Sequence, residues 1–110
     1  MSILRERRSA LENTKEKLIE QLAEHLDILR KRARLTQEET AKAIGISRQT
    51  YCQIENKNSV MSWNVYMALM MLFSNKSETK ELLSVLKIEP EKVVGLVVEE
   101  TCNSKNEIDR

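Results

Sequence analysis

Residues 45–56 read GISRQTYCQIEN, a stretch with the form of a tight turn followed by a short helix. Gly45 suits the turn, because glycine adopts a positive φ angle at little cost. Ser47 is one of the residue types that most often cap a helix N-terminus. Tyr51 and Ile54 are three positions apart, so they share one face of the helix, which we expect to face the core. The stretch therefore predicts a serine-capped helix with one buried face.

The residues before this turn predict a second short helix. Thr36 and Glu39 have the spacing of a capping box, in which each side chain bonds the backbone N–H of the other residue. The helix then continues to about Ile44, with Ala41 and Ile44 facing inward. Two short helices joined by a turn of about three or four residues, here centred on Gly45, are the sequence form of a helix-turn-helix.

A long helix is predicted upstream, over residues 3–34. Its leucines recur at intervals of seven and then of three or four positions, as Leu4, Leu11, Leu18, Leu22, Leu26 and Leu29. A coiled coil would need a second apolar residue in each heptad at the positions of Arg8 and Lys15, so the coiled-coil signal is weak. The first part of this helix is either a solvated arm or an arm that forms a dimer.

Two further helices are predicted after a loop of turn-forming residues at 56–59. Ser62 caps a helix over residues 63–73, whose apolar side chains cover most of its circumference. A helix of this kind is buried centrally or shared with a partner. Another helix follows over residues 77–86, with its leucines facing inward.

Residues 89–110 are predicted to form a short C-terminal extension. Pro90 suits the first turn of a helix, whereas VVGLVV at 93–98 has a strand-like composition, and we favour a short helix. Residues 101–110 carry one apolar residue after Cys102, so a disordered tail is expected there.

Composition favours an all-helical, globular chain. Of the 110 residues, 41% are apolar and 32% are charged, and there are only two Gly and one Pro, fewer than strand-and-turn folds need. The net charge is +1, divided into +3 over residues 1–57 and −2 over residues 58–110. The basic excess thus lies in the half that contains the helix-turn-helix pattern.

The sequence argues against several other classes of protein. No run of about 18 apolar residues exists and the N-terminus lacks the apolar region of a secretory signal, so we expect no membrane span and no secretion. Cys52 and Cys102 are too few and too far apart for a disulfide framework or a zinc site, which favours a cytoplasmic location. His25 is the only histidine, and there is no glycine-rich phosphate loop. We therefore expect neither an enzyme nor a cofactor or metal site.

Residues 26–73 resemble the Cro/CI-type (XRE-type) helix-turn-helix family of bacterial and phage regulators. The motifs that carry the resemblance are Leu29-Arg30, LTQEExA at 35–41, GISRQTY at 45–51 and IEN at 54–56. The family implies an all-α, five-helix lambda-repressor-like DNA-binding domain, here with an extended N-terminal helix and a short C-terminal extension. We accordingly divide the chain into an N-terminal helical arm (1–22), a Cro/CI-type domain (23–88) and a C-terminal extension with its tail (89–110).

In this family the third helix, here residues 47–55, lies in the major groove of DNA. The resemblance implies that it reads base edges with Arg48, Gln49 and Gln53. The chemistry agrees, because Arg can bridge O6 and N7 of guanine and Gln can bridge N6 and N7 of adenine. These residue types are also ordinary solvated helix residues, and the surrounding motif is what favours base reading. Cys52 is expected on the same side, as a small neutral groove-facing residue or, alternatively, as a redox switch.

The resemblance also implies contacts to the DNA backbone, made by Gln37, Ser47, Thr50, Asn56, Lys57 and Asn58. Gln37 and the amides at its helix end would hold one phosphate, and Asn56 matches a second phosphate clamp. Many relatives have Gly where Lys57 stands and Pro where Met61 stands. We therefore expect Asn56 or Asn58 to take the left-handed conformation in this loop.

Arg30 and Glu55 match a pair that, in this family, forms a largely buried ion pair between the first and third helices. Such a pair would be structural and would fix the angle of the recognition helix, so we assign neither residue to DNA contact.

Together these features predict a sequence-specific DNA-binding transcriptional regulator that acts as a repressor. Its expected partners are double-stranded DNA and a second copy of the chain, as a homodimer. The alternative is an antitoxin or protein-interaction module that uses the arm or the C-terminal segment to bind a partner protein. A toxin-like reading frame adjoining the gene would favour that alternative.

Overall fold

The structure is a computed structural model that describes residues 2–88, with side chains from residue 13 onward. Over this part of the chain it contains no strand and five helices: α1 (Ser2–Arg32), α2 (Gln37–Ile44), α3 (Arg48–Glu55), α4 (Trp63–Ser74) and α5 (Ser77–Val85). The predicted all-α, five-helix fold is therefore confirmed. The expectations for 89–110, including the short helix at 93–98 and the disordered tail, fall outside the described residues.

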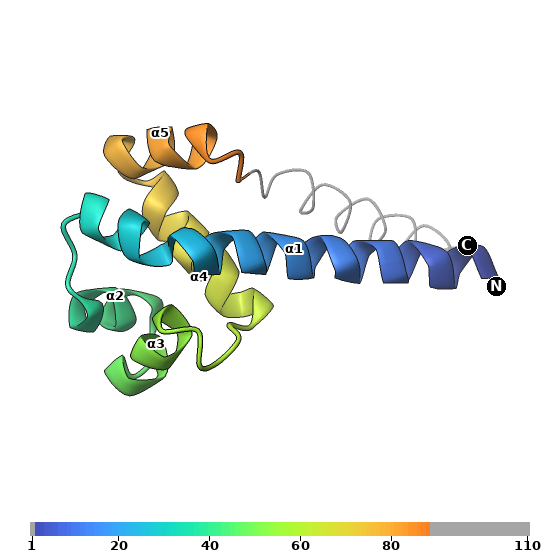
Figure 1. The fold of residues 1–110 in the computed structure, drawn as a ribbon, viewed down its shortest axis with the longest axis horizontal. Helices are drawn as coiled ribbons and strands as arrows, with labels where there is room; N and C mark the ends of the chain where they lie inside the picture. The colour runs from blue at the N-terminus through green and yellow to red at the C-terminus, as the bar shows by residue number, and fades with distance from the viewer. Residues whose placement is uncertain (1, 89–110) are drawn as a thin grey trace, which may run out of the picture.

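The five helices are arranged around α1. Figure 1 shows α2 and α3 together on one side of α1, α5 on the other side, and α4 crossing α1, which it contacts. The N-terminal part of α1 extends well beyond the other four helices (Figure 1). None of the described helices combines the length and apolarity needed to cross a membrane.

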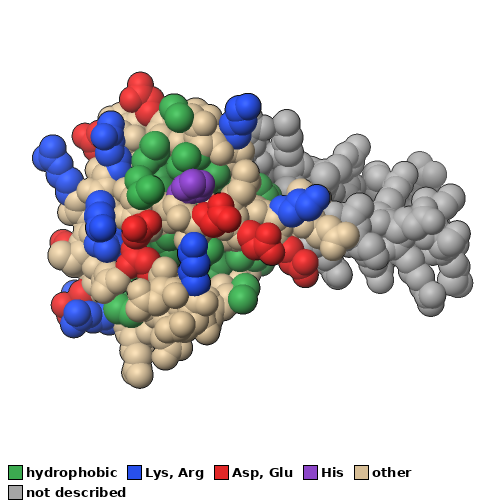
Figure 2. Space-filling view, viewed as in Figure 1, with side chains coloured by type: hydrophobic (Ala, Val, Ile, Leu, Met, Phe, Trp, Pro, Cys, Tyr) green, Lys and Arg blue, Asp and Glu red, His purple; other side chains and the backbone are tan. Residues whose placement is uncertain are grey.

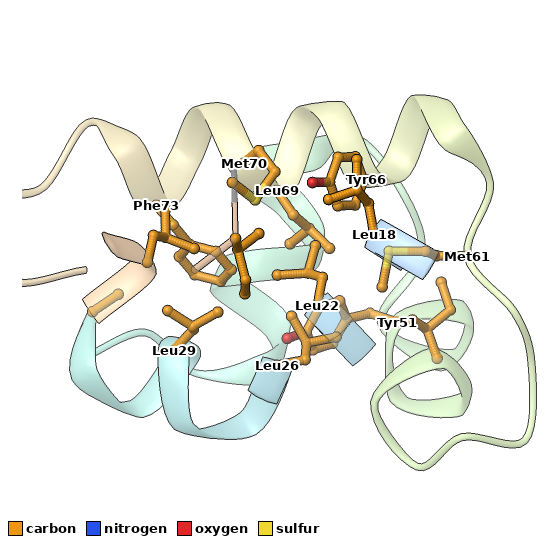
Figure 3. Packing of buried hydrophobic residues seen from close by; sticks show 14 of the residues in the cluster. Leu18, Leu22, Leu26, Leu29, Tyr51, Met61, Tyr66, Leu69, Met70 and Phe73 are labelled. Carbon is orange, nitrogen blue, oxygen red and sulfur yellow. The ribbon is translucent and has the colours of Figure 1, made fainter. Parts of the chain in front are cut away.

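The core is built on one face of α1. Its buried leucines follow one another at intervals of three and four residues, which keeps them on one side of the helix; they are Leu18, Leu22, Leu26 and Leu29. In Figure 3 they lie against apolar side chains of α3 and α4, among them Tyr51, Leu69 and Phe73. Each large apolar side chain buried in this way contributes about 1.5–3 kcal/mol. Leu18 is the first buried residue among those whose side chains the structure describes.

The central helix α4 is buried on one face rather than on all sides. Its inward side chains are at most 3% exposed, namely Tyr66, Leu69, Met70 and Phe73, whereas Met71 is 78% exposed. At its start the Trp63 ring stacks on Tyr66 with 4.8 Å between centroids, and the Lys15 ammonium lies 5.2 Å from the Trp63 centroid. This cation–π contact connects α1 to the first turn of α4.

The predicted helix caps are confirmed at three N-termini. At α2 the Thr36 hydroxyl accepts from the Glu39 N–H and the Glu39 carboxylate accepts from the Thr36 N–H, each at 3.0 Å. The hydroxyls of Ser47 and Ser62 cap α3 and α4 in the same manner. The two hydrogen bonds of the capping box lower the pKa of Glu39, and the bond that the Thr36 backbone N–H donates is the largest cause. Local sequence signals therefore set where these helices begin.

One expectation about the loop after α3 was wrong. Lys57 takes the left-handed conformation, with φ 64°, whereas Asn56 has φ −79°. The reason is the hydrogen-bond pattern that ends the helix: the Asn58 N–H bonds the Gln53 carbonyl at 2.9 Å and the Lys57 N–H bonds the Ile54 carbonyl at 3.1 Å. This Schellman pattern requires a left-handed residue at one position, whatever side chain stands there.

The same pattern ends three other helices of the described chain. Gly45 occupies the left-handed position after α2, with φ 78°, as its residue type predicts. After α1 and α5 the position is held by Arg34 and Lys87, with φ 59° and 60°. Three basic side chains thus stand where glycine would be less strained.

Candidate nucleic-acid interface

Helix α3 divides into a buried face and an exposed face. Tyr51 is 0% exposed and Ile54 is 3% exposed, which confirms that they face the core. Arg48, Gln49 and Gln53 are all exposed on the surface of the same helix. The buried pair belongs to the core and α3 contacts α1 and α2, so the three polar side chains are presented from a rigid element.

The N-terminal end of α3 is closed by Ser47 and Thr50. The Ser47 hydroxyl accepts a hydrogen bond from the Thr50 N–H at 3.1 Å and donates one to Thr50 Oγ1 at 2.8 Å. Its donor and acceptor are both engaged inside the protein, as a cap. The Thr50 side chain is exposed, and its own hydroxyl proton is not used in this pair.

The C-terminal end of α3 leads into an exposed polar loop. Asn56, Lys57 and Asn58 are all exposed, and the two asparagines carry amide donors on either side of the lysine ammonium. The exposed part of α3 itself bears Arg48 and no carboxylate, since Glu55 is the only acidic residue of the helix. Together α3 and this loop form a surface of donors and positive charge, which suits a polyanion.

An ion pair connects the end of α1 to the end of α3. Arg30 Nε donates to Glu55 Oε1 at 2.8 Å, and the two side chains are 14% and 5% exposed. Arg30 Nη1 also donates to the Leu35 carbonyl at 3.0 Å. The bond to Glu55 raises the pKa of the Arg30 guanidinium, and burial raises the pKa of the neighbouring Tyr51 hydroxyl. The geometry fixes α3 relative to α1.

Gln37 joins this group from the first turn of α2. Its Nε2 donates to Glu55 Oε2, and its Oε1 accepts from the Cys52 thiol at an Sγ···O distance of 3.2 Å. Sequence reasoning gave Gln37 a role only toward DNA and placed Cys52 as a groove-facing residue, so it missed this connection. The two residues are 15 positions apart, and only the crossing of α2 and α3 brings them together.

The interface offers no site for a metal. Among the described residues, no group of His, Cys, Asp or Glu side chains is arranged to hold a metal ion. The chemistry available at this surface is therefore that of hydrogen-bond donors, acceptors and two exposed cations, Arg48 and Lys57.

Helices α2 and α3 are joined by a tight turn, and α3 has one buried apolar face and one exposed polar face. This arrangement defines a helix-turn-helix domain of the kind that binds DNA. Residues 21–73 match the model of a family described as a helix-turn-helix domain, which is consistent with the Cro/CI (XRE) type that the sequence motifs resemble. The match contains α2, α3 and their turn. No curated protein and no solved structure gives a significant match to the chain.

Proposed function

We propose that the chain is a sequence-specific DNA-binding transcriptional regulator, a repressor that acts in the cytoplasm as a homodimer. Helix α3 lies in the major groove of double-stranded DNA, and the chain divides into an arm (1–22), a reading domain (23–88) and an extension (89–110). The observation that carries the proposal is the pair of faces on α3, one packed into the core and one displaying Arg48, Gln49 and Gln53.

Base reading is assigned to three of the exposed side chains of α3, those of Arg48, Gln49 and Gln53. Arg48 suits a guanine, and Gln49 and Gln53 each suit an adenine, through bidentate hydrogen bonds to base edges. Each such contact discriminates against a wrong base by about 1–3 kcal/mol. A rigid helix favours this role, since bidentate geometry leaves little room for displacement.

Backbone positioning is assigned to residues at the ends of α2 and α3. Gln37 stands at the N-terminus of α2, where backbone N–H groups also favour an anion. Thr50 lies beside the reading face, and Asn56, Lys57 and Asn58 follow it in the loop. Ser47 acts first as the cap, because both functions of its hydroxyl are already used.

A dimer is expected from the size of the reading helix. The eight residues of α3 span about 12 Å, which covers only a few base pairs. Two such helices about 34 Å apart read a two-fold symmetric site over one turn of DNA. A dimer bound in this way blocks other proteins from the same DNA, which is sufficient for repression.

The test is selection from a randomised duplex pool with the full chain, followed by sequencing of the bound sites. We expect an inverted repeat with half-sites about one helical turn apart. Gln49→Ala should lose discrimination at one position of each half-site, while Gln21→Ala, an exposed glutamine of α1, should leave the selected site unchanged. No enrichment by a folded chain would refute the proposal.

A second candidate function is binding of a partner protein through the arm or the C-terminal segment, as an antitoxin does; four large apolar side chains exposed on the described residues, Met71 and Val85 among them, favour such a partner. Met71 on α4 and Val85 on α5 are 78% and 75% exposed. A toxin-like reading frame beside the gene, whose product forms a complex with this chain, would support this function. It is compatible with DNA binding, since neither residue lies on α2 or α3.

A further inference from the structure

The amide of Gln37 is held at both of its ends. Nε2 donates to Glu55 Oε2, and Oε1 accepts from the Cys52 thiol at 3.2 Å. Gln37 and Cys52 are both half-buried, in contrast to the exposed Gln49 and Gln53. Cys52 therefore does not project as far from α3 as the two glutamines that flank it on the reading face.

The two partners of Gln37 differ in what they accept and donate. An ionised carboxylate only accepts, so Glu55 requires the N–H end of the amide. Glu55 also takes Arg30 Nε at 2.8 Å and the Tyr51 hydroxyl at 3.5 Å, which holds it in place. The Cys52 thiol supplies the donor for the opposite end. Rotating the amide by half a turn would place its oxygen against the Glu55 carboxylate, which can only accept, so one orientation of Gln37 is selected.

This selection leaves one donor of Gln37 for a ligand. The Nε2 group has two N–H bonds, of which Glu55 uses one. The second N–H belongs to a side chain at the N-terminus of α2, beside backbone amides that also favour an anion. With the carbonyl end held by Cys52, the group that meets a phosphate is a donor and not an acceptor.

We propose that Cys52 is a positioning residue for the phosphate clamp, acting through the amide of Gln37 and not by touching a base. This inference rests on the proposed DNA-binding function. It predicts that the thiol contributes to affinity for any duplex and adds nothing to sequence preference. A side chain that projects from α3 into the groove and touches a base would instead contribute to sequence preference.

The test compares Cys52→Ala, Cys52→Ser, Gln37→Ala and the Cys52→Ala/Gln37→Ala double variant in the full chain. Affinities are measured by fluorescence anisotropy on the selected duplex and on a scrambled one, at several salt concentrations. We expect Cys52→Ala to weaken binding to both duplexes about three- to tenfold, because one neutral hydrogen bond is lost. Cys52→Ser, which keeps a donor, should restore most of the affinity.

Two features separate positioning from other roles. In the Gln37→Ala background, Cys52→Ala should have no further effect on affinity, because the thiol acts only through that amide. The salt dependence of binding should stay unchanged, since a neutral amide releases no counterion. Additive losses in the double variant, or a changed preference between the two duplexes, would overturn the inference.

A readout without DNA completes the experiment. In the ¹⁵N–¹H spectrum of the free chain, the Gln37 side-chain NH₂ protons should exchange slowly with water and differ in shift from those of an exposed glutamine such as Gln21; they should move toward the exposed-glutamine shifts in Cys52→Ala and return in Cys52→Ser. Unchanged Gln37 signals would refute the positioning role even if the chain binds DNA. Absence of DNA binding by the wild-type chain would instead refute the proposed function, and with it the role of the clamp. Equal thermal unfolding of the variants confirms that all are folded.

Discussion

Replacing Lys57 by glycine should stabilise the protein and weaken its binding to DNA at the same time. Lys57 has φ 64° in the turn that ends α3. A side chain in this left-handed region costs about 1–2 kcal/mol, which glycine avoids. Glycine also gains conformational freedom in the unfolded chain, which offsets about 0.5–1 kcal/mol of that stabilisation. The net expected gain in the free energy of unfolding is about 0.5–1 kcal/mol, or about 2–8 °C in the melting temperature.

Lys87 provides a matched control. It has φ 60° in the equivalent turn after α5, and like Lys57 it is exposed. Lys87→Gly removes the same charge from the end of a helix and relieves the same strain, so its melting temperature should rise by a similar amount. It lies outside the helix-turn-helix, and its DNA affinity should not change beyond the small effect of one distant charge.

The assay is thermal unfolding followed by circular dichroism, together with anisotropy titrations at several salt concentrations. Lys57→Gly should lower the slope of log affinity against log salt by about one for each subunit, while Lys87→Gly leaves it unchanged. A fall in stability in both variants would refute the strain argument. Equal binding losses in both would refute the assignment of Lys57 to a phosphate contact.

Three further outcomes follow from the described core and caps. Arg30→Ala leaves Glu55 buried without its charged partner and should lower the free energy of unfolding, measured in urea, by about 3 kcal/mol. This is the lower end of the usual range, because the Arg30 side chain is 14% exposed. Unchanged stability would contradict a structural role for the pair. Leu26→Ala, at a position that is 0% exposed, should cost about 2–5 kcal/mol, and a loss below 1 kcal/mol would mean that the core collapses around the gap. Glu39 has a lowered pKa in the folded chain, so the stability it contributes is present above its ordinary value of 4.5 and is lost as pH falls through the lower folded value. Stability of Glu39→Gln should accordingly vary less with pH in that range, and an identical pH profile would show that the capping box contributes nothing.

The sequence predicted the local features of the fold well. The capping box of Thr36 and Glu39, the glycine turn at Gly45 and the buried pair Tyr51 and Ile54 depend only on residues within a few positions of one another. Signals of this range are encoded in helical periodicity and in the chemistry of helix ends. They were sufficient to place α2, α3 and the buried face of α3.

Features that depend on tertiary geometry were harder to predict. Residue preference pointed to Asn56 or Asn58 for the left-handed position, but the hydrogen bonds that end α3 assigned it to Lys57. The bonds that join Gln37 to Cys52 and Glu55 arise from the crossing of α2 and α3, which no local pattern specifies. Apart from the Arg30–Glu55 pair, the candidate site was therefore predicted as separate side chains, and the structure shows that several of them form one hydrogen-bonded network.

The shortness of α3 has a consequence for how the protein would respond to temperature. A helix of eight residues is unstable by itself in water, so it exists only while the core holds Tyr51 and Ile54. The reading surface and the native state are then lost together, in one cooperative event. Occupancy of a DNA site would follow the folded fraction of the chain. A destabilising substitution in the buried face of α1 would then release DNA as completely as a substitution on the reading face.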